Sequence, residues 1–265
     1  MKSPLGLQAD LPVVDIVRES IGLLWQKKEA VVRMFFPAVA LLALVDWAGS
    51  EFFAEDALTA RIIFFVTSMV LGVMFATATH RFTLLAPEHW DSNAVHGWTK
   101  TEFRYLGQAA LIGIIGGFLI VVLMMVLSLL LGKDGIVVAV VAAILPALYV
   151  MSRLSITLPE VAIGQPSSPG RAWQMSAGNG SRLVLVVIII PLLLMSPFLV
   201  LYALDSTLLN YIAAFGSYIT TLISLVMLSV SYRFLLEFYE RNTPPGNGRE
   251  EQDSTDDSNT TGFDA

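Results

Sequence analysis

The residues of this chain that could bind a metal or transfer a proton are few, and most of them lie in one segment. The segment "PEHWDSNAVH" contains Glu88, His89, Asp91 and His96, and His80 is the only other histidine. Imidazole and carboxylate groups are ligands of transition metals, but their spacing here matches no zinc-binding signature. We therefore predict a solvated loop without a metal site.

No other set of residues points to an enzyme. The apolar part of the sequence contains no Ser/His/Asp arrangement and no close pair of carboxylates, the groups that carry nucleophilic or acid–base catalysis. The sequence also lacks the GxxxxGK[ST] pattern of a phosphate-binding loop, and "GNG" at 178–180 is too short to replace it. We predict a non-enzymatic protein that binds no cofactor and no nucleic acid.

Prolines and hydroxyl groups in the apolar segments suggest an alternative function. Pro191 and Pro197, in "PLLLMSP", could interrupt a membrane helix and expose backbone carbonyls to a cavity. The residues that would line this cavity are Pro191, Ser196, Thr220 and Ser224. The protein would then be a permease or channel for a small neutral or anionic solute. The competing interpretation is that the hydroxyl groups form hydrogen bonds between helices. We expect the carboxylate of Asp46 to lie at the outer interface.

The composition predicts that these residues belong to a membrane protein. Apolar residues make up 55% of the 265 positions, charged residues only 14%, and the mean hydropathy is +0.69. Soluble domains carry about 25% charged residues. We predict an all-α, polytopic protein with six transmembrane helices, because six apolar segments qualify as helices across a bilayer core of about 30 Å. The predicted spans are 34–49, 62–79, 106–131, 135–152, 183–204 and 206–232.

The basic residues predict how the helices are oriented. If both termini lie on one side, that side receives all of the 16 Lys and Arg residues except Arg61 and Lys133. Basic residues accumulate in cytoplasmic loops. We therefore predict a bacterial inner-membrane protein with both termini in the cytoplasm, composed of an N-terminal segment (1–30) with an interfacial amphipathic helix, a membrane domain (31–240) and a disordered acidic tail (241–265).

A pattern of tryptophan, arginine and glutamate occurs three times. An arginine that ends an even-numbered span precedes a glutamate by seven residues, and a tryptophan precedes each odd-numbered span. The copies contain Trp25, Arg81 and Glu88, then Trp98, Arg153 and Glu160, then Trp173, Arg233 and Glu240. Repetition of this kind predicts three tandem helical hairpins, at about 15–88, 92–160 and 168–240, related by an axis along the membrane normal.

Indole and guanidinium groups at these positions predict contacts with lipid headgroups or other anions. A tryptophan ring is stable at headgroup depth, and an arginine can lie along apolar surface while its guanidinium reaches a phosphate. The candidate contacts are Arg81, Arg104, Arg153, Arg171, Arg182, Arg233, Trp25, Trp98 and Trp173. We expect Arg153 to lie at the phosphates and Glu160 to face water. Gly113 and Gly117 form a GxxxG pattern that predicts close helix packing, within the chain or in a homo-oligomer.

The segment 153–187 resembles a weakly defined family of uncharacterised bacterial six-helix membrane proteins. The family is similar to the membrane domain found beside some glycerophosphodiester phosphodiesterases. The matching residues are Arg153, Pro159, Glu160, Ala172, Trp173, Gly178 and Asn179. The resemblance implies a six-helix fold over about 230 residues but no catalytic residues, and this chain has no phosphodiesterase domain. We predict an accessory or scaffold protein that contacts anionic lipids and a partner protein.

Overall fold

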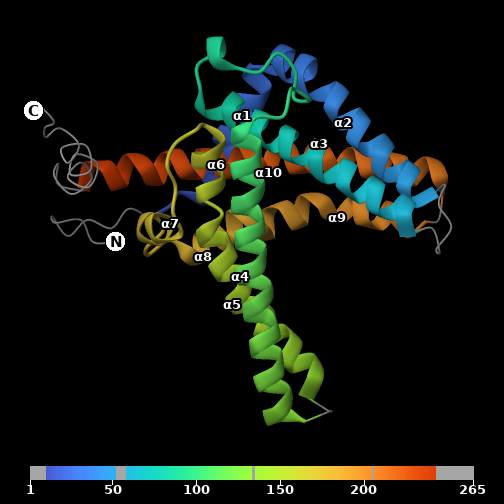
Figure 1. The fold of residues 1–265 in the computed structure, drawn as a ribbon. Helices are drawn as coiled ribbons and strands as arrows, with labels where there is room; N and C mark the ends of the chain where they lie inside the picture. The colour runs from blue at the N-terminus through green and yellow to red at the C-terminus, as the bar shows by residue number, and fades with distance from the viewer. Residues whose placement is uncertain (1–9, 52–57, 133–134, 205, 243–265) are drawn as a thin grey trace, which may run out of the picture.

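The computed structural model of the chain describes residues 10–51, 58–132, 135–204 and 206–242 (Figure 1). These residues are helical, as predicted, with no strand among them. The predicted tail lies outside the described residues from position 243 onward. The helices are α1 (Val13–Gln26), α2 (Lys28–Glu51), α3 (Leu58–Leu84), η1 (Pro87–His89), α4 (Lys100–Leu131), α5 (Ile136–Leu154), α6 (Thr157–Ala162), α7 (Pro169–Met175), α8 (Gly180–Val184), η3 (Leu185–Ile189), α9 (Ile190–Tyr202) and α10 (Thr207–Asn242).

Six helical segments in the described ranges are long and apolar enough to cross a membrane, which confirms the predicted number of spans. They are Lys28–Gly49, Leu58–Leu84, Lys100–Leu131, Ile136–Ala162, Gly180–Tyr202 and Thr207–Glu240. The span Lys100–Leu131 begins before its apolar core, and polar residues cap this end. Before α4, Thr99 and Glu102 form a capping box, in which the N–H of Thr99 donates to Oε2 of Glu102 at 2.8 Å. The chain is therefore a polytopic membrane protein.

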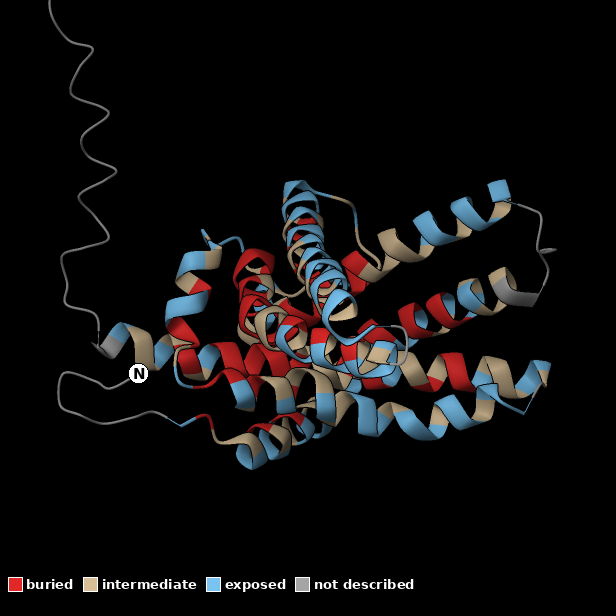
Figure 2. Ribbon diagram, turned by 90° about the horizontal axis from the view of Figure 1, so that it is seen from below, coloured by how far each residue is buried: buried red, intermediate tan, exposed pale blue. Residues whose placement is uncertain are grey.

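Helix α10 is at the centre of the packing. It contacts α1, α2, α3 and α9, whereas the α4–α5 hairpin runs across these helices and its outer half extends away from them (Figures 1 and 2). The members of each predicted pair of spans contact each other: α2 with α3, α4 with α5, and α9 with α10. The predicted pseudo-threefold arrangement of three equivalent hairpins is not confirmed, because α4 and α5 do not lie alongside the other four spans.

Buried residues gather where the helices meet (Figure 2). The rings of Phe75 and Phe82 in α3 lie edge-on to Phe35 in α2, with ring centres 5.7 Å and 5.4 Å away. Farther out, side chains such as Phe118 and Leu129 of α4 are 70% and 78% exposed. Lipid tails are as apolar as leucine, so this surface needs no protein cover in a bilayer. The core is therefore concentrated at one end of the spans.

The fifth span is continuous, although it contains the two prolines predicted to interrupt it. Pro191 lies in the first turn of α9, and the turn just before it, η3, is π-helical. Proline has no N–H for the carbonyl four residues earlier, and a single wider π turn is a common way to accommodate a local defect. The hydroxyl of Ser196 donates to the carbonyl of Leu193 at 2.8 Å. The helix therefore accommodates its prolines locally and is not interrupted.

Glycine packing within the α4–α5 hairpin uses Gly116 and not the predicted GxxxG pair. A Cβ atom on Gly116 would lie 2.3 Å from Sδ of Met151, whereas one on Gly113 or Gly117 would meet nothing within 4 Å. Gly113 and Gly117 thus lie on a face of α4 that is open in the described chain. Their predicted role in a homo-oligomer stays a prediction.

We expect Gly116→Leu to destabilise the hairpin and Gly117→Leu to leave its folding unchanged. The first substitution forces Met151 out of its place, and overpacking of this kind costs about 1–3 kcal/mol. SDS-induced unfolding of the two variants measures the difference. The same two variants test the predicted homo-oligomer. If α4 packs against a second copy through Gly113 and Gly117, Gly117→Leu should lower the dimer fraction and Gly116→Leu should not. Equal stability of the two variants would show that α4 and α5 do not pack through Gly116.

Candidate anion-binding site at the basic end of the helices

The basic end of the molecule is the end of the spans at which α2, α4 and α8 begin and α3 and α5 finish. Arg81, in the last turn of α3, is held there by internal partners. Its guanidinium donates to Oε1 of Glu102 at 2.8 Å, to Oδ2 of Asp91 at 3.2 Å and to the carbonyl of Ala162 at 3.0 Å. The side chain of Glu102 is fully buried, and its Oε1 is also 3.1 Å from Nε2 of His96. Arg81 therefore joins α3 to α4 and α6.

Arg153 is also held by buried partners, whereas Arg233 has a half-exposed one. Arg153 is 6% exposed, and it donates from Nε to Oγ of Ser176 at 2.9 Å and from Nη2 to the carbonyl of Trp173. Its Cζ also lies 3.5 Å from the centre of the Trp173 ring. Arg233, in α10, forms an ion pair with Glu19 of α1. Both guanidinium groups thus connect the end of a span to a surface helix.

These contacts follow a cyclic order along the chain. The arginine that ends the first predicted hairpin contacts the loop and helix that begin the second. The arginine of the second contacts α7, which begins the third, and the arginine of the third contacts α1, which begins the first. We call Arg81, Arg153 and Arg233, together with these partners, the arginine collar. The collar connects the three pairs of spans in a ring at the basic end.

The three glutamates of the repeated pattern lie in different environments. Glu160 is 1% exposed and pairs through Oε1 with Nε of Arg171 at 2.8 Å, so the expectation that it faces water is wrong. The reason is α6, which packs under α3, α4 and α10 and carries Glu160 inward. Glu88 and Glu240 are exposed. In the described chain, none of the three forms an ion pair with the arginine seven residues before it.

The remaining predicted contacts differ in exposure. Nη1 of Arg182 lies 2.6 Å from Oδ1 of Asp10 and, through this hydrogen-bonding contact, holds the pKa of that carboxyl below its usual value. Trp98 is half-buried. Arg104 and Trp25 are exposed, with 73% of Trp25 accessible. Of the nine predicted residues, these two are the ones best placed to contact lipid directly.

The histidines of the predicted solvated loop are separated by the fold. His89 is exposed on η1, but His96 and Asp91 are largely buried beside the Arg81 guanidinium, so this part of the loop is not solvated as expected. A guanidinium already neutralises the carboxylates where a metal would have to bind. Within the described ranges, no group of three or more His, Asp or Glu side chains could hold a metal ion.

His80 lies inside the spans and joins three of them. It is fully buried in α3, with Nδ1 2.7 Å from Oγ of Ser229 in α10 and Nε2 3.2 Å from the hydroxyl of Tyr105 in α4. A neutral imidazole has one donor and one acceptor nitrogen, and both have a partner here. This residue therefore holds the helices together next to the collar.

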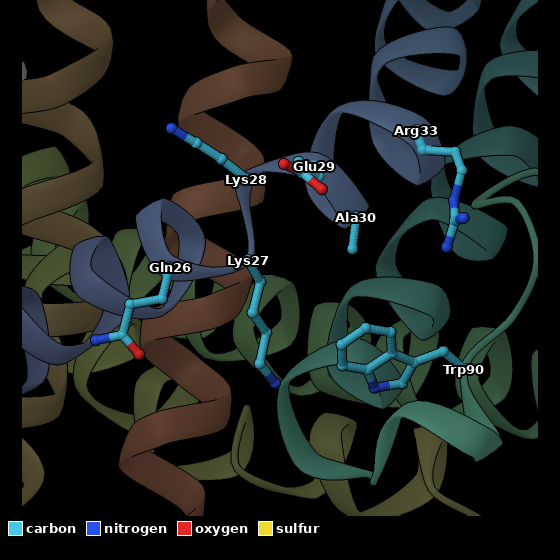
Figure 3. A pocket seen from close by; sticks show the side chains of 7 residues that line it. All are labelled: Gln26, Lys27, Lys28, Glu29, Ala30, Arg33 and Trp90. Carbon is cyan, nitrogen blue, oxygen red and sulfur yellow. The ribbon is translucent and has the colours of Figure 1, made fainter.

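The free cations of the basic end gather at the joint between α1 and α2. Helix α1 ends at Gln26, and Lys27 is the single residue outside the helices before α2 begins at Lys28. The chain changes direction at this residue, whose N–H still donates to the carbonyl of Leu23 at 3.1 Å. A cavity of about 620 Å³ lies beside the joint and is lined by Gln26, Lys27, Lys28, Glu29, Ala30, Arg33 and Trp90 (Figure 3). We call it the Lys27–Trp90 pocket.

The charge in this pocket is positive. Lys27, Lys28 and Arg33 line it together with one carboxylate, Glu29. No carboxylate oxygen of the described residues lies within 4 Å of any of the three cations. Figure 3 shows Lys27 and Arg33 extending toward Trp90, while Lys28 and Glu29 point away. The pocket therefore offers two converging cations that the protein itself does not neutralise.

One aromatic residue, Trp90, also lines the pocket, and the buried Phe82 lies near it. Nζ of Lys27 lies 4.6 Å from the centre of the Trp90 ring and 5.5 Å from that of Phe82. The indole is fixed because its Nε1 donates to the carbonyl of Leu85 at 3.0 Å, and the loop is fixed to α2 because the N–H of Ala94 donates to the carbonyl of Met34 at 3.2 Å. A cation over an aromatic face is attracted by the ring, so Lys27 is held in position for a ligand.

The hydroxyl groups of the alternative function donate to nearby carbonyls. Thr220 donates to the carbonyl of Gly216 at 3.1 Å, and Ser224 donates to that of Thr220 at 2.7 Å. Ser196 is exposed on α9, and Pro191 is half-buried. The Lys27–Trp90 pocket is lined by other residues. The solute-path interpretation therefore gains no support from these hydroxyl groups.

We expect Arg81→Gln to lower the free energy of unfolding by about 3–5 kcal/mol, because it leaves the buried carboxylate of Glu102 without its cation. Arg18→Gln is the matched control. Arg18 and Asp15 are 3.6 Å apart but 79% and 69% exposed, and exposed pairs contribute less than about 1 kcal/mol. SDS-induced unfolding compares the two variants. Equal stability would show that the collar does not hold the basic end together.

The family resemblance of residues 153–187 rests on the sequence alone. Two of its residues, Arg153 and Trp173, are stacked in the collar, and a third, Glu160, is paired with Arg171. No protein-family model, no curated protein and no solved structure matches the chain. Membership of the predicted family stays a prediction, and the function rests on the residues of the site.

Proposed function

We propose that this chain is a non-enzymatic accessory or scaffold protein of the inner membrane that binds anionic lipid headgroups in the Lys27–Trp90 pocket. One observation carries the proposal: three cations without a carboxylate partner line a cavity at the first residues of a spanning helix. That is the depth at which the phosphates of a bilayer lie. A phosphate there would neutralise charges that the protein leaves unpaired.

Two further forces favour an anion in this place. Helix α2 begins at Lys28, and the helix dipole gives its N-terminus a partial positive charge. Lys27 is oriented by the Trp90 ring, so less conformational entropy is lost when the amine binds a ligand. Guanidinium and ammonium groups then form charge-assisted hydrogen bonds to phosphate oxygens.

We place the pocket on the cytoplasmic side, with both termini in the cytoplasm. The support is the asymmetric distribution of the basic residues. Of the 16 Lys and Arg residues, all except Arg61 and Lys133 fall at the termini and loops of this side. The cytoplasmic leaflet carries anionic lipids that attract such residues. Arg104, exposed at the start of α4, is a second contact with the same leaflet.

We also propose that the chain consists of three tandem hairpin repeats. The cyclic order of the arginine collar supports this, because each closing arginine contacts an element at the start of the next predicted repeat. A scaffold role fits the α4–α5 hairpin, whose exposed apolar surface is available to a partner protein or, at Gly113 and Gly117, to a second copy.

The test is a lipid competition with the triple variant Lys27→Gln, Lys28→Gln, Arg33→Gln. Each cation near a membrane surface contributes about 1 kcal/mol of attraction to anionic lipid, so the triple change should weaken retention about hundredfold. Native mass spectrometry of protein released from nanodiscs that contain phosphatidylglycerol and phosphatidylcholine measures the retained lipid.

The matched control removes three exposed cations outside the pocket: Arg18→Gln, Arg61→Gln, Lys100→Gln. Both variants have the same net charge. We expect the control to keep most of the bound phosphatidylglycerol, because the pocket is intact. An equal loss of bound phosphatidylglycerol in both variants would show that general surface charge causes the retention, and this would overturn the assignment of the pocket.

A further inference from the structure

A second polar site lies at the other end of α2. Asp46 is 18 residues after Lys28, which corresponds to about 27 Å along the helix and is close to the thickness of a bilayer core. A cavity of about 230 Å³ opens here and is lined by Val45, Asp46, Gly49, Arg61, Phe64, Phe65 and Ser68. Ionisable residues within membrane helices are costly and mark functional sites by default.

Three helices hold the carboxylate of Asp46. Its Oδ1 accepts a hydrogen bond from Ser68 of α3 at 2.5 Å, and its Oδ2 accepts one from the hydroxyl of Tyr218 in α10. Each carboxylate oxygen has about two acceptor positions, so capacity remains on both. Asp46 is exposed in the structure. The protein therefore orients this carboxylate without saturating it.

Arg61, the cation that lines this cavity, does not form an ion pair with Asp46. Arg61 and Asp46 line the same space, yet no nitrogen of Arg61 lies within 4 Å of a carboxylate oxygen of the described residues. Arg61 precedes Ser68 by seven residues in α3, a separation of about 10 Å along the helix. Because Ser68 contacts Asp46, the carboxylate lies deeper in the molecule and the guanidinium nearer its surface.

We propose that this cavity binds a small soluble zwitterion, with its ammonium group at Asp46 and its anionic group at Arg61. An ammonium has three N–H donors for the carboxylate, and a guanidinium binds carboxylate or phosphate through two parallel hydrogen bonds. The volume lies below the usual range for drug-sized ligands, about 300–1,000 Å³, so the ligand is small. Phe64 and Phe65 cover its apolar middle.

The order of the two charges distinguishes a soluble ligand from a lipid. In an aminophospholipid the phosphate is joined to glycerol and lies deeper than the ammonium group. The cavity has the opposite order. Asp46, which would accept hydrogen bonds from an ammonium group, lies deeper, and Arg61, which would bind an anionic group, lies nearer the end of the helix. A soluble molecule that enters with its ammonium group first matches this order. The site is independent of the anionic headgroups proposed for the other end of α2.

The experiment uses ω-amino acids as probes of the charge separation. Glycine, 4-aminobutyrate and 6-aminohexanoate are titrated into the full-length protein in phosphatidylcholine nanodiscs, with methylamine and acetate as probes of a single charge. Calorimetry measures the affinity. We expect the two longer probes to bind at least about tenfold more tightly than glycine or either single-charge probe, because they carry both charges and hold them farther apart than glycine does. No binding, or equal binding of methylamine, overturns the proposal.

Substitutions on both sides of the cavity locate the binding. We expect Arg61→Gln and Asp46→Asn each to weaken 6-aminohexanoate about tenfold or more. Arg61 is exposed near the start of α3, so its variant folds even if loss of the Asp46 hydrogen bonds disturbs the helices. Arg33→Gln, at the other end of α2, is the matched control and should bind the probe normally. Unchanged affinity in Arg61→Gln overturns the assignment.

A last arm separates the soluble ligand from a lipid headgroup. The titration is repeated in nanodiscs that contain phosphatidylethanolamine. We expect the affinity for 6-aminohexanoate to be unchanged. If the unmodified protein binds the probe in phosphatidylcholine but not in nanodiscs that contain phosphatidylethanolamine, the lipid headgroup fills the cavity, and this overturns the soluble assignment. Because Arg33→Gln weakens only the retention of phosphatidylglycerol, failure here is distinguishable from failure of the function proposed for the Lys27–Trp90 pocket.

Discussion

The ion pairs and hydrogen bonds of Arg81, Arg153 and Arg233 are the interaction on which the basic end of this protein depends. Spans in a bilayer gain little from apolar contact with each other, because lipid is an equally good neighbour. Polar contacts at the ends of the helices must therefore supply much of the specificity. Each of these arginines connects the end of one pair of spans to the element that precedes the next, so three such contacts link the pairs of spans at this end.

The collar also decides which charges are available for function. A guanidinium that neutralises a buried carboxylate, as Arg81 does with Glu102, cannot also hold a lipid phosphate without leaving that carboxylate unpaired. The cations that can bind a ligand are therefore those outside the collar. Lys27 and Arg33 are such cations, and both line the pocket beside Trp90. The separation of structural from available cations is a property of the whole fold and not of any one segment.

The two ends of α2 differ in the chemistry they offer. At its start, cations exceed carboxylates and an aromatic wall orients one of them. Near its end, one carboxylate and one guanidinium share a cavity without pairing. The α4–α5 hairpin takes no part in either place, and its outer half presents apolar side chains over most of its surface. The helices around α10 thus hold the polar sites, while this hairpin offers surface to lipid or to a partner.

The sequence alone determined the helical class and the number of spans, because the length and hydropathy of a segment depend only on local composition. It also identified Arg81, Arg153 and Arg233 as members of one pattern. Their partners could not be predicted, since Glu102, Ser176 and Glu19 are 21, 23 and 214 residues away in the chain. Only the tertiary structure brought Trp90 to Lys27 and carried Glu160 inward with α6. Pairing energies depend on distances in space, which the order of residues does not contain.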